Sequence, residues 1–186
     1  IGSNESFPYK NHPLKGIVSD DIIDICRLYP DPYCRNLRAK LSAINSVPVQ
    51  EVLVDAGADS LIFLALRVRV NVGDVVVTTA GTYPTFKYFA EGVGAEIVEV
   101  PYKEERKGLS VDLEALGAAA KKHSAALVYI ANPDNPTGHV HSAESIESLR
   151  RSLPESTTLI VDEAYIDFSP SHSLRLVPRS EAWRNT

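Results

Sequence analysis

The sequence predicts an α/β fold in which helices cover both faces of a doubly wound, mostly parallel sheet. From Val49 onward, short β-branched runs alternate with helical patterns, and most of these runs are apolar throughout. Strands that are apolar on both faces are buried on both faces, and the alternation is typical of parallel strands joined by right-handed helical crossovers. Ligands of such sheets bind beyond the carboxyl ends of the strands, so we expect the chemistry in the segments that follow the strands.

The order of the elements follows from this alternation. The expected strands span residues 51–54, 74–78, 96–100, 125–131 and 158–161. The expected helices span residues 59–68, 85–91, 112–123 and 142–152. Residues 1–45 are rich in proline and contain one helix-like stretch, Ser19–Leu28, which predicts an N-terminal arm with part of a small domain. Residues 46–186 are then expected to form a large domain that is incomplete in this chain.

Composition and charge exclude several classes of protein. With 44% hydrophobic and 23% charged residues, the 186-residue chain has an ordinary globular composition. The net charge of −5 and the lack of a basic run argue against a nucleic-acid partner. Apolar stretches are shorter than the ~20 residues of a membrane span, and no leader is recognisable, so we expect no membrane partner and a cytoplasmic location. Cys26 and Cys34 are expected to be free thiols.

Two loops after expected strands carry candidate binding residues. Residues 55–60 combine small side chains with a helix start at Asp59 and Ser60, whose free N–H groups suit a phosphate; the alternative is an ordinary capped helix start. The loop that ends in Thr82-Tyr83-Pro84 presents an aromatic ring at the same edge of the sheet. Tyr83 is therefore either a stacking platform or a packing residue.

Two further loops carry an amide, a carboxylate and a phenol. In residues 131–138, two Asn-Pro steps impose a fixed, non-helical path that suits the presentation of Asn135, although Asn135 could instead cap the next helix. Asp162 ends an apolar strand and Tyr165 follows three residues later. A carboxylate buried at the end of a strand requires a partner.

Other motifs at these positions do not fit. An acidic pair after an apolar strand also occurs in P-loop ATPases, but the Gly-x-x-x-x-Gly-Lys-Ser/Thr loop is missing from the sequence. Gly92 and Gly94 lack the third glycine of a dinucleotide fingerprint and follow a helical stretch. His139 and His141 would need a third ligand to bind a metal, so a solvated loop is the favoured interpretation and no metal site is expected.

Taken together and in this order, four motifs resemble the class I/II, fold-type I aminotransferases, which use pyridoxal phosphate. The motifs are Gly57-Ala58-Asp59-Ser60, Thr82-Tyr83-Pro84, Asn135-Pro136-Thr137-Gly138 and Asp162-Glu163-Ala164-Tyr165. Within that group, Tyr29-Pro30-Asp31-Pro32 followed by Leu37-Arg38, with Ser3-Asn4-Glu5 near the start, is similar to the histidinol-phosphate aminotransferase branch. The resemblance extends from about Ser3 to about Phe168.

The resemblance implies a role for each candidate residue. Pyridoxal phosphate acts as an electron sink only while its ring nitrogen is protonated, and Asp162 suits that task. Asn135 and Tyr165 would donate to the phenolic oxygen of the ring, and Tyr83 would stack on its face. The phosphate would lie at the helix start formed by Ala58, Asp59 and Ser60. In the family, the tyrosine that matches Tyr29 reaches the phosphate of the neighbouring subunit, which implies a homodimer with shared active sites.

The implied reaction moves an amino group from an amino acid, typically glutamate, to a keto acceptor such as imidazole-acetol phosphate. The family's Schiff-base lysine lies in a Ser-Lys motif beyond the strand that ends in Asp162. The lysines of this chain all precede Asn135 and none has that setting, so we expect the chain alone to be inactive. A pyridoxal-phosphate lyase or decarboxylase on the same scaffold and a non-catalytic shortened relative remain alternatives.

Overall fold

A computed structural model describes residues 28–106 and 108–169 of the chain. The chain divides into two compact units, Ile1–Leu37 and Arg38–Thr186. In the first unit, the Asp31 carboxylate accepts hydrogen bonds from the backbone N–H groups of Arg35 and Tyr33, which lower its pKa. Helix α2 (Arg35–Asn45) begins at this turn and was not expected, while the expected helix at 19–28 lies almost wholly outside the described residues.

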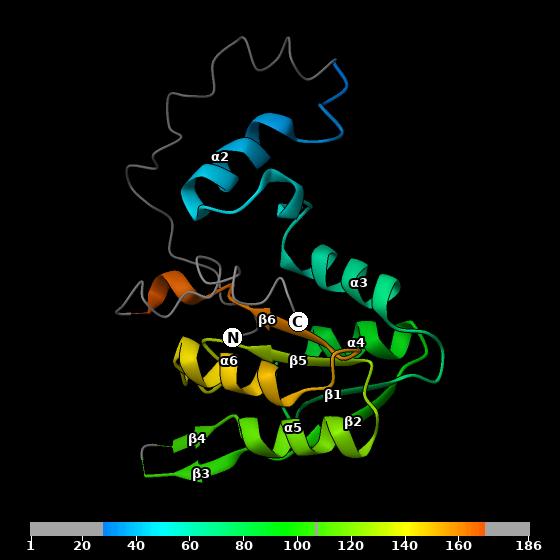
Figure 1. Cartoon of the computed structure of the whole chain (residues 1–186), viewed down its shortest axis with the longest axis vertical. Helices are drawn as coiled ribbons and strands as arrows, with labels where there is room; N and C mark the ends of the chain where they lie inside the picture. Colours follow the sequence, from blue (N-terminus) through cyan, green and yellow to red (C-terminus); the bar gives the residue numbers. More distant parts are fainter. Residues whose placement is uncertain (1–27, 107, 170–186) are drawn as a thin grey trace. The chain divides into compact units, whose positions relative to one another are not determined.

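The second unit contains a four-stranded, all-parallel sheet in the order β2-β1-β5-β6 (Figure 1). Its strands are β1 (Val75–Thr79), β2 (Glu96–Val100), β5 (Leu127–Ala131) and β6 (Thr158–Asp162). All four were expected from the sequence to within two residues at each end. Because the strands are parallel, the loops that follow β1, β5 and β6 emerge at the same edge of the sheet.

Helices cover both faces of the sheet, as the sequence predicted (Figure 1). Helices α3 (Ala58–Arg69) and α4 (Pro84–Gly92) pack on one face against Val76, Leu127 and Tyr129. Helices α5 (Leu113–Lys122) and α6 (Ala143–Ser152) pack on the other face against Val77, Val128 and Ile130. Successive residues of a strand point to opposite faces, so each buried strand contributes to both cores.

Local signals set the helix boundaries. The Asp112 side chain accepts a hydrogen bond from the Ala115 N–H at the start of α5, and Ser142 accepts one from the Ser145 N–H at the start of α6. Gly117 permits the close approach of these two helices, because a Cβ atom there would lie 2.9 Å from Ser152 Oγ. The capping residues and this glycine therefore fix how α5 and α6 pack over the sheet.

Two segments differ from the expected elements. The predicted strand at 51–54 is wrong: Val49–Glu51 form a short 3-10 helix, η1, and residues 52–55 are not in a strand. A β-branched run becomes a strand only where a neighbouring strand accepts its backbone hydrogen bonds, and none does so in the described part of the chain. Conversely, β3 (Lys103–Glu105) and β4 (Gly108–Ser110) form an antiparallel hairpin. It was not expected, because the residues of this segment are mostly charged and do not alternate between polar and apolar.

A second 3-10 helix, η2 (Ile166–Phe168), follows β6. No helix within the described ranges is both long and apolar enough to cross a membrane.

Candidate functional site

The loops at the carboxyl ends of β1, β5 and β6 enclose a pocket together with the start of α3. We call it the loop pocket. Its lining residues are Ala58, Asp59, Tyr83, Ala131, Pro133, Asn135, Asp162, Ala164 and Tyr165. The structure thus brings together six of the eight residues singled out from the sequence. The other two are Ser60, which lies in the first turn of α3 but does not line the pocket, and Tyr29, which belongs to the other unit.

The start of α3 presents backbone donors without a side-chain cap. Its N-cap residue is Gly57, whose φ of +87° lies in the left-handed region that glycine tolerates, and no side chain among the described residues accepts a hydrogen bond from the first turn. The hydroxyl of Ser60 donates instead to the Ala56 carbonyl, 3.2 Å away. The first turn of α3 therefore has no side-chain cap, and its N–H groups are left to water or a ligand.

Tyr83 reaches across the pocket wall to α3. Its hydroxyl donates to both carboxylate oxygens of Asp59, at 3.0 and 3.2 Å. A hydrogen bond with Thr85 lowers the pKa of the Tyr83 phenol, but burial and the Asp59 carboxylate outweigh it and raise the pKa above its ordinary value. Tyr83 therefore stays protonated at neutral pH, and its ring is held between α3 and the loop after β1.

Asp162 is half-buried at the end of β6, and it has the partners that the sequence led us to expect of a carboxylate at this position. Its Oδ2 accepts a hydrogen bond from the Tyr129 hydroxyl at 2.9 Å, and its Oδ1 accepts one from the Ala164 N–H at 3.0 Å. Tyr129 is fully buried and stacks on Phe86 with ring centroids 4.1 Å apart. Burial, together with the negative charge of Asp162, raises the pKa of Tyr129, so its hydroxyl remains a donor.

Sequence reasoning missed Tyr129 because it lies inside an apolar strand. The available signal was a phenol in the middle of β5, since a buried hydroxyl must find a partner. The partner is supplied by the next strand, because β5 and β6 pair so that Ala131 lies opposite Asp162.

The Asn-Pro loop after β5 is clamped at its base. The fully buried side chain of Asn132 accepts from the His141 N–H at 2.8 Å and donates to the His141 carbonyl at 3.2 Å. Asn135 is half-buried, and its amide has no hydrogen bond within the described residues. Because Ser142 caps α6, the alternative in which Asn135 is a helix cap is wrong. Asn135 therefore offers a free amide to the loop pocket.

Asp134, also missed from the sequence, is the most deeply buried carboxylate of this edge, with 4% of its surface exposed. Its side chain accepts hydrogen bonds from Thr82, Tyr102 and Thr137. Only Thr137, three residues later, is near enough in sequence to have signalled such a role. The other two donors come from loops more than 30 residues away and could not be paired without the fold.

Comparison with known proteins identifies the family. Residues 26–182 match the family Aminotransferase class I and II. The chain belongs to the class I and II aminotransferases. It is 31% identical over 182 residues to histidinol-phosphate aminotransferase 1 of Nostoc sp., a match that covers 97% of this chain and 49% of that relative. It is 35% identical over 150 residues to histidinol-phosphate aminotransferase of Roseiflexus castenholzii, covering 81% of this chain and 39% of the relative.

A solved structure shares both fold and sequence with this aminotransferase chain. Histidinol-phosphate aminotransferase from Sinorhizobium meliloti, in complex with pyridoxal-5'-phosphate, is 39% identical and superposes with a TM-score of 0.73. The match covers 79% of this chain and 39% of the other. The chain thus spans about half or less of the length of the relatives it matches.

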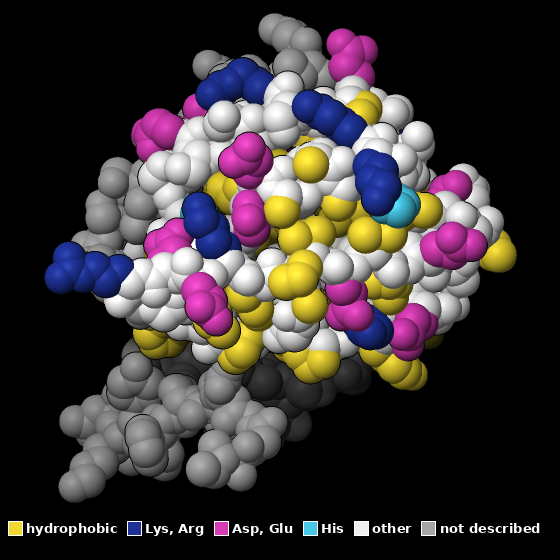
Figure 2. Space-filling model, turned by 90° about the horizontal axis from the view of Figure 1, so that it is seen from below, with side chains coloured by type: hydrophobic (Ala, Val, Ile, Leu, Met, Phe, Trp, Pro, Cys, Tyr) yellow, Lys and Arg dark blue, Asp and Glu magenta, His cyan; other side chains and the backbone are white. Residues whose placement is uncertain are grey.

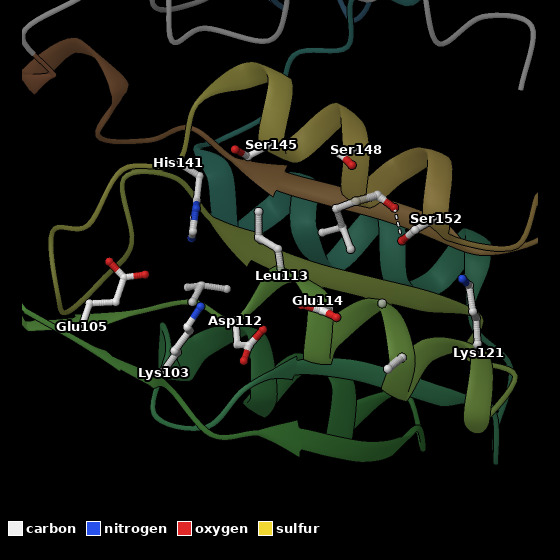
Figure 3. Close-up of a pocket in the computed structure, with 14 residues that line it drawn as sticks. Lys103, Glu105, Asp112, Leu113, Glu114, Lys121, His141, Ser145, Ser148 and Ser152 are labelled. Atoms are coloured by element: carbon white, nitrogen blue, oxygen red, sulfur yellow. Dashed lines mark hydrogen bonds between the residues drawn. The ribbon is translucent and has the colours of Figure 1, made fainter.

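A larger groove of the aminotransferase chain, about 710 Å³, lies against α5 and α6 and contains none of the residues of the four motifs (Figure 3). His141 points into it beside Glu105 and Lys103, while Ser148 and Ser152 line it from α6 (Figure 3). Its lining mixes two lysines, Lys103 and Lys121, with the acidic residues Glu105, Asp112 and Glu114, so neither charge dominates the groove. Seen from below, the molecule likewise shows charged side chains of both signs around hydrophobic ones (Figure 2).

The two histidines near this groove lie in a loop, as expected, but both are half-buried rather than solvated. The rings of His139 and His141 lie 4.6 Å apart, and Nε2 of His141 is buried without a hydrogen-bond partner in the described structure. Burial, followed by the charge of His139, lowers the pKa of His141. The described residues contain no group of three or more His, Cys, Asp or Glu that could hold a metal ion.

Proposed function

We propose that the whole protein is a pyridoxal-phosphate-dependent aminotransferase of the histidinol-phosphate type. It would transfer an amino group between an amino acid such as glutamate and a keto acceptor such as imidazole-acetol phosphate. The histidinol-phosphate aminotransferases among the relatives support the transferase over the lyase and decarboxylase alternatives. The observation that carries the proposal is the loop pocket, which collects residues from all four motifs.

The donor set at this pocket fits an aromatic ring that carries a phosphate. The uncapped first turn of α3 would hold the phosphate through backbone N–H groups of Ala58, Asp59 and Ser60. The Asp59 side chain would not serve as a ligand, because it is negatively charged and already accepts the Tyr83 hydroxyl. Within α3, the phosphate contacts would therefore come from backbone amides rather than from the Asp59 side chain.

Three further residues would orient the ring. Asp162 would hold a proton at the ring nitrogen with a carboxylate that Tyr129 and the Ala164 N–H already orient. Asn135 and Tyr165 would donate to the phenolic oxygen, and Tyr83 would lie against the ring face. When bound, pyridoxal phosphate supplies the electron sink for reactions at the α-carbon of an amino acid.

Two parts of the proposal concern chemistry outside the loop pocket. The family's Schiff-base lysine has no counterpart among the lysines of this chain, so we propose that the chain alone forms no stable covalent adduct with the cofactor. Borohydride reduction followed by peptide mass mapping tests this, and a stoichiometric pyridoxyl group on one specific lysine would contradict it. We also propose a cytoplasmic homodimer in which Tyr29 completes the phosphate site of the neighbouring subunit, which sedimentation of the full-length protein would test.

A binding experiment tests the pocket assignment. The probe is 4'-deoxypyridoxine 5'-phosphate, which keeps the ring, hydroxyl and phosphate but lacks the aldehyde that reacts with surface lysines. We expect it to bind the 186-residue chain more tightly than the same ring without phosphate, and Asn135→Ala to weaken that binding by about tenfold. Asn71→Ala, in an exposed turn, is the matched control. Equal binding of both probes, or no binding, would count against the proposal.

A further inference from the structure

The carboxylate of Asp134 is enclosed by the loops that follow three different strands. It is 4% exposed and accepts hydrogen bonds from Thr82 Oγ1 at 3.3 Å and from the Tyr102 hydroxyl at 2.9 Å. Thr137 adds two more, from its hydroxyl at 2.7 Å and its backbone N–H at 3.3 Å. One side chain thus joins the loops after β1, β2 and β5.

The charge of Asp134 is balanced by neutral donors. No ion pair to this carboxylate is found within residues 28–106 and 108–169. Burial, together with the charge of Asp134, raises the pKa of the Tyr102 phenol, so this donor keeps its proton. A buried carboxylate without a cation is stable only while its hydrogen bonds are made. The three loops are therefore held where those donors reach it.

Two of the bonded residues are sequence neighbours of pocket-lining residues. Thr82 precedes Tyr83, and Asp134 precedes Asn135. Tyr83 and Asn135 both line the loop pocket, whereas Thr82 and Asp134 are buried behind it. The bond between Thr82 and Asp134 therefore joins the two loops directly behind two of the pocket walls.

We infer that Asp134 is a positioning residue that, through Thr82, sets the separation between the Tyr83 ring and the Asn135 amide. That separation determines how well a flat aromatic ring fits between these two groups. The identity of the ring rests on the proposed function, but the positioning role does not. Asp134 itself does not line the pocket and would touch no ligand there.

The two carboxylate oxygens of Asp134 allow this role to be separated from a general contribution to stability. Oδ1 accepts one hydrogen bond from the described residues, that of Thr82, whereas Oδ2 accepts three. Thr82→Val therefore leaves Oδ1 without its donor and frees the loop of Tyr83 from that of Asn135. Tyr102→Phe also removes one hydroxyl, but Oδ2 keeps both bonds from Thr137.

The first measurement needs no ligand. In ¹H–¹⁵N NMR spectra of the 186-residue chain, we expect Thr82→Val to shift the side-chain amide signals of Asn135 and Tyr102→Phe to leave them in place. Thr82→Ser keeps the hydroxyl and should restore the signals of the unmodified chain. If Thr82→Val does not fold, Thr82→Ala tests the same bond, because it also removes the hydroxyl that donates to Oδ1.

The second measurement is binding of 4'-deoxypyridoxine 5'-phosphate. We expect its dissociation constant to rise about tenfold in Thr82→Val and to stay within about twofold in Tyr102→Phe. Unshifted Asn135 signals in Thr82→Val, or an equal loss of binding in both variants, would overturn the inference. Absence of binding to the unmodified chain would count against the proposed function, and the Asn135 signals alone would then decide the positioning role.

Discussion

Asp134 and Asp162 lie at the same edge of the sheet but in different surroundings. Asp134 is 4% exposed and accepts four hydrogen bonds from neighbouring loops. Asp162 is half-buried, lines the loop pocket and accepts one bond from Tyr129 and one from the Ala164 N–H. One carboxylate has its bonding capacity met within the protein, and the other keeps capacity for a ligand.

The difference shows how one edge of a parallel sheet supports both stability and binding. Parallel strands deliver several loops to the same place, where their polar groups must be satisfied. Here the loops bond to one another behind the pocket through Asp134 and leave Asn135 and the first turn of α3 open in front. The buried hydrogen bonds to Asp134 can then hold the residues of the loop pocket in place without contacting a ligand in that pocket.

The largest expected effect is a difference in the free energy of unfolding between variants that lack Asp134 and variants that lack Asp162. Asp134→Ala should lower the free energy of unfolding by about 3 kcal/mol or more, because it removes the acceptor of four hydrogen bonds, among them those from buried Thr82 and half-buried Tyr102. Asp162→Ala should cost less, about 1–2 kcal/mol, because it removes the acceptor of two hydrogen bonds and leaves one buried hydroxyl, that of Tyr129, without it. Urea unfolding of both variants measures this difference. Equal losses would contradict the distinction drawn here.

The next effect concerns turnover, where a substitution at Asp162 should matter more than one at Asp134. In the full-length protein, Asp162→Asn should reduce turnover by about 10²-fold, which corresponds to about 2.7 kcal/mol, because a neutral amide cannot hold the proton at the ring nitrogen. Cofactor binding should fall less, since the phosphate and stacking contacts remain. Glu163→Gln is the control, because Glu163 is the next carboxylate in the sequence and does not line the loop pocket. Near-parental turnover in Asp162→Asn with loss in Glu163→Gln would refute the assignment of the carboxylates.

A smaller effect tests how Asp162 is oriented. Tyr129→Phe removes the hydroxyl that donates to Asp162 but preserves the buried ring and its stacking on Phe86. We expect a loss of about 1 kcal/mol in the free energy of unfolding, the usual net value of one hydrogen bond. Calorimetric or urea unfolding provides the measurement, with Tyr102→Phe as the matched loss of a hydroxyl at Asp134. A loss of several kcal/mol in the free energy of unfolding of Tyr129→Phe would mean that water reaches Asp162 no better than it reaches Asp134.

Much of the fold could be predicted because each element carries its own signal. The buried strands are apolar runs, Pro84 starts α4, and Asp112 and Ser142 cap α5 and α6. The strand expected at 51–54 failed because strand formation depends on a neighbouring strand that local sequence does not reveal. The β3–β4 hairpin was missed for the converse reason, since its pairing joins residues that have no strand composition.

The site divides in the same way. Ala58, Tyr83, Asn135 and Asp162 follow expected strands or open an expected helix, so topology alone brought them to one edge. Asp134 and Tyr129 depend instead on hydrogen bonds between residues 32 or more apart in the sequence. Such pairs become visible only when the strand order and register are known.

The smallest expected effect is a pH dependence of the free energy of unfolding that comes from His141, near Asp134. His141 is held by Asn132 at the base of the Asn-Pro loop, and burial, followed by the charge of His139, lowers its pKa. The carboxylates of Glu105 and Asp134 and a hydrogen bond with the Val111 backbone favour the protonated form but do not outweigh burial. The unfolded chain therefore takes up a proton at His141 more readily than the folded chain does. The resulting stability is present above the ordinary histidine pKa of 6.5 and is lost as the pH falls below it.

Unfolding free energies at two pH values test this. Those measured at pH 7.5 and 5.5, about one unit to either side of that pKa, should differ less in His141→Gln than in the unmodified chain. His123→Gln, at the exposed end of α5, should leave that difference unchanged. An identical pH dependence in His141→Gln and the unmodified chain would show that the folded protein tolerates a positive charge on His141. The surroundings of Asp134 would then be more accessible to water than the burial of Asp134 indicates.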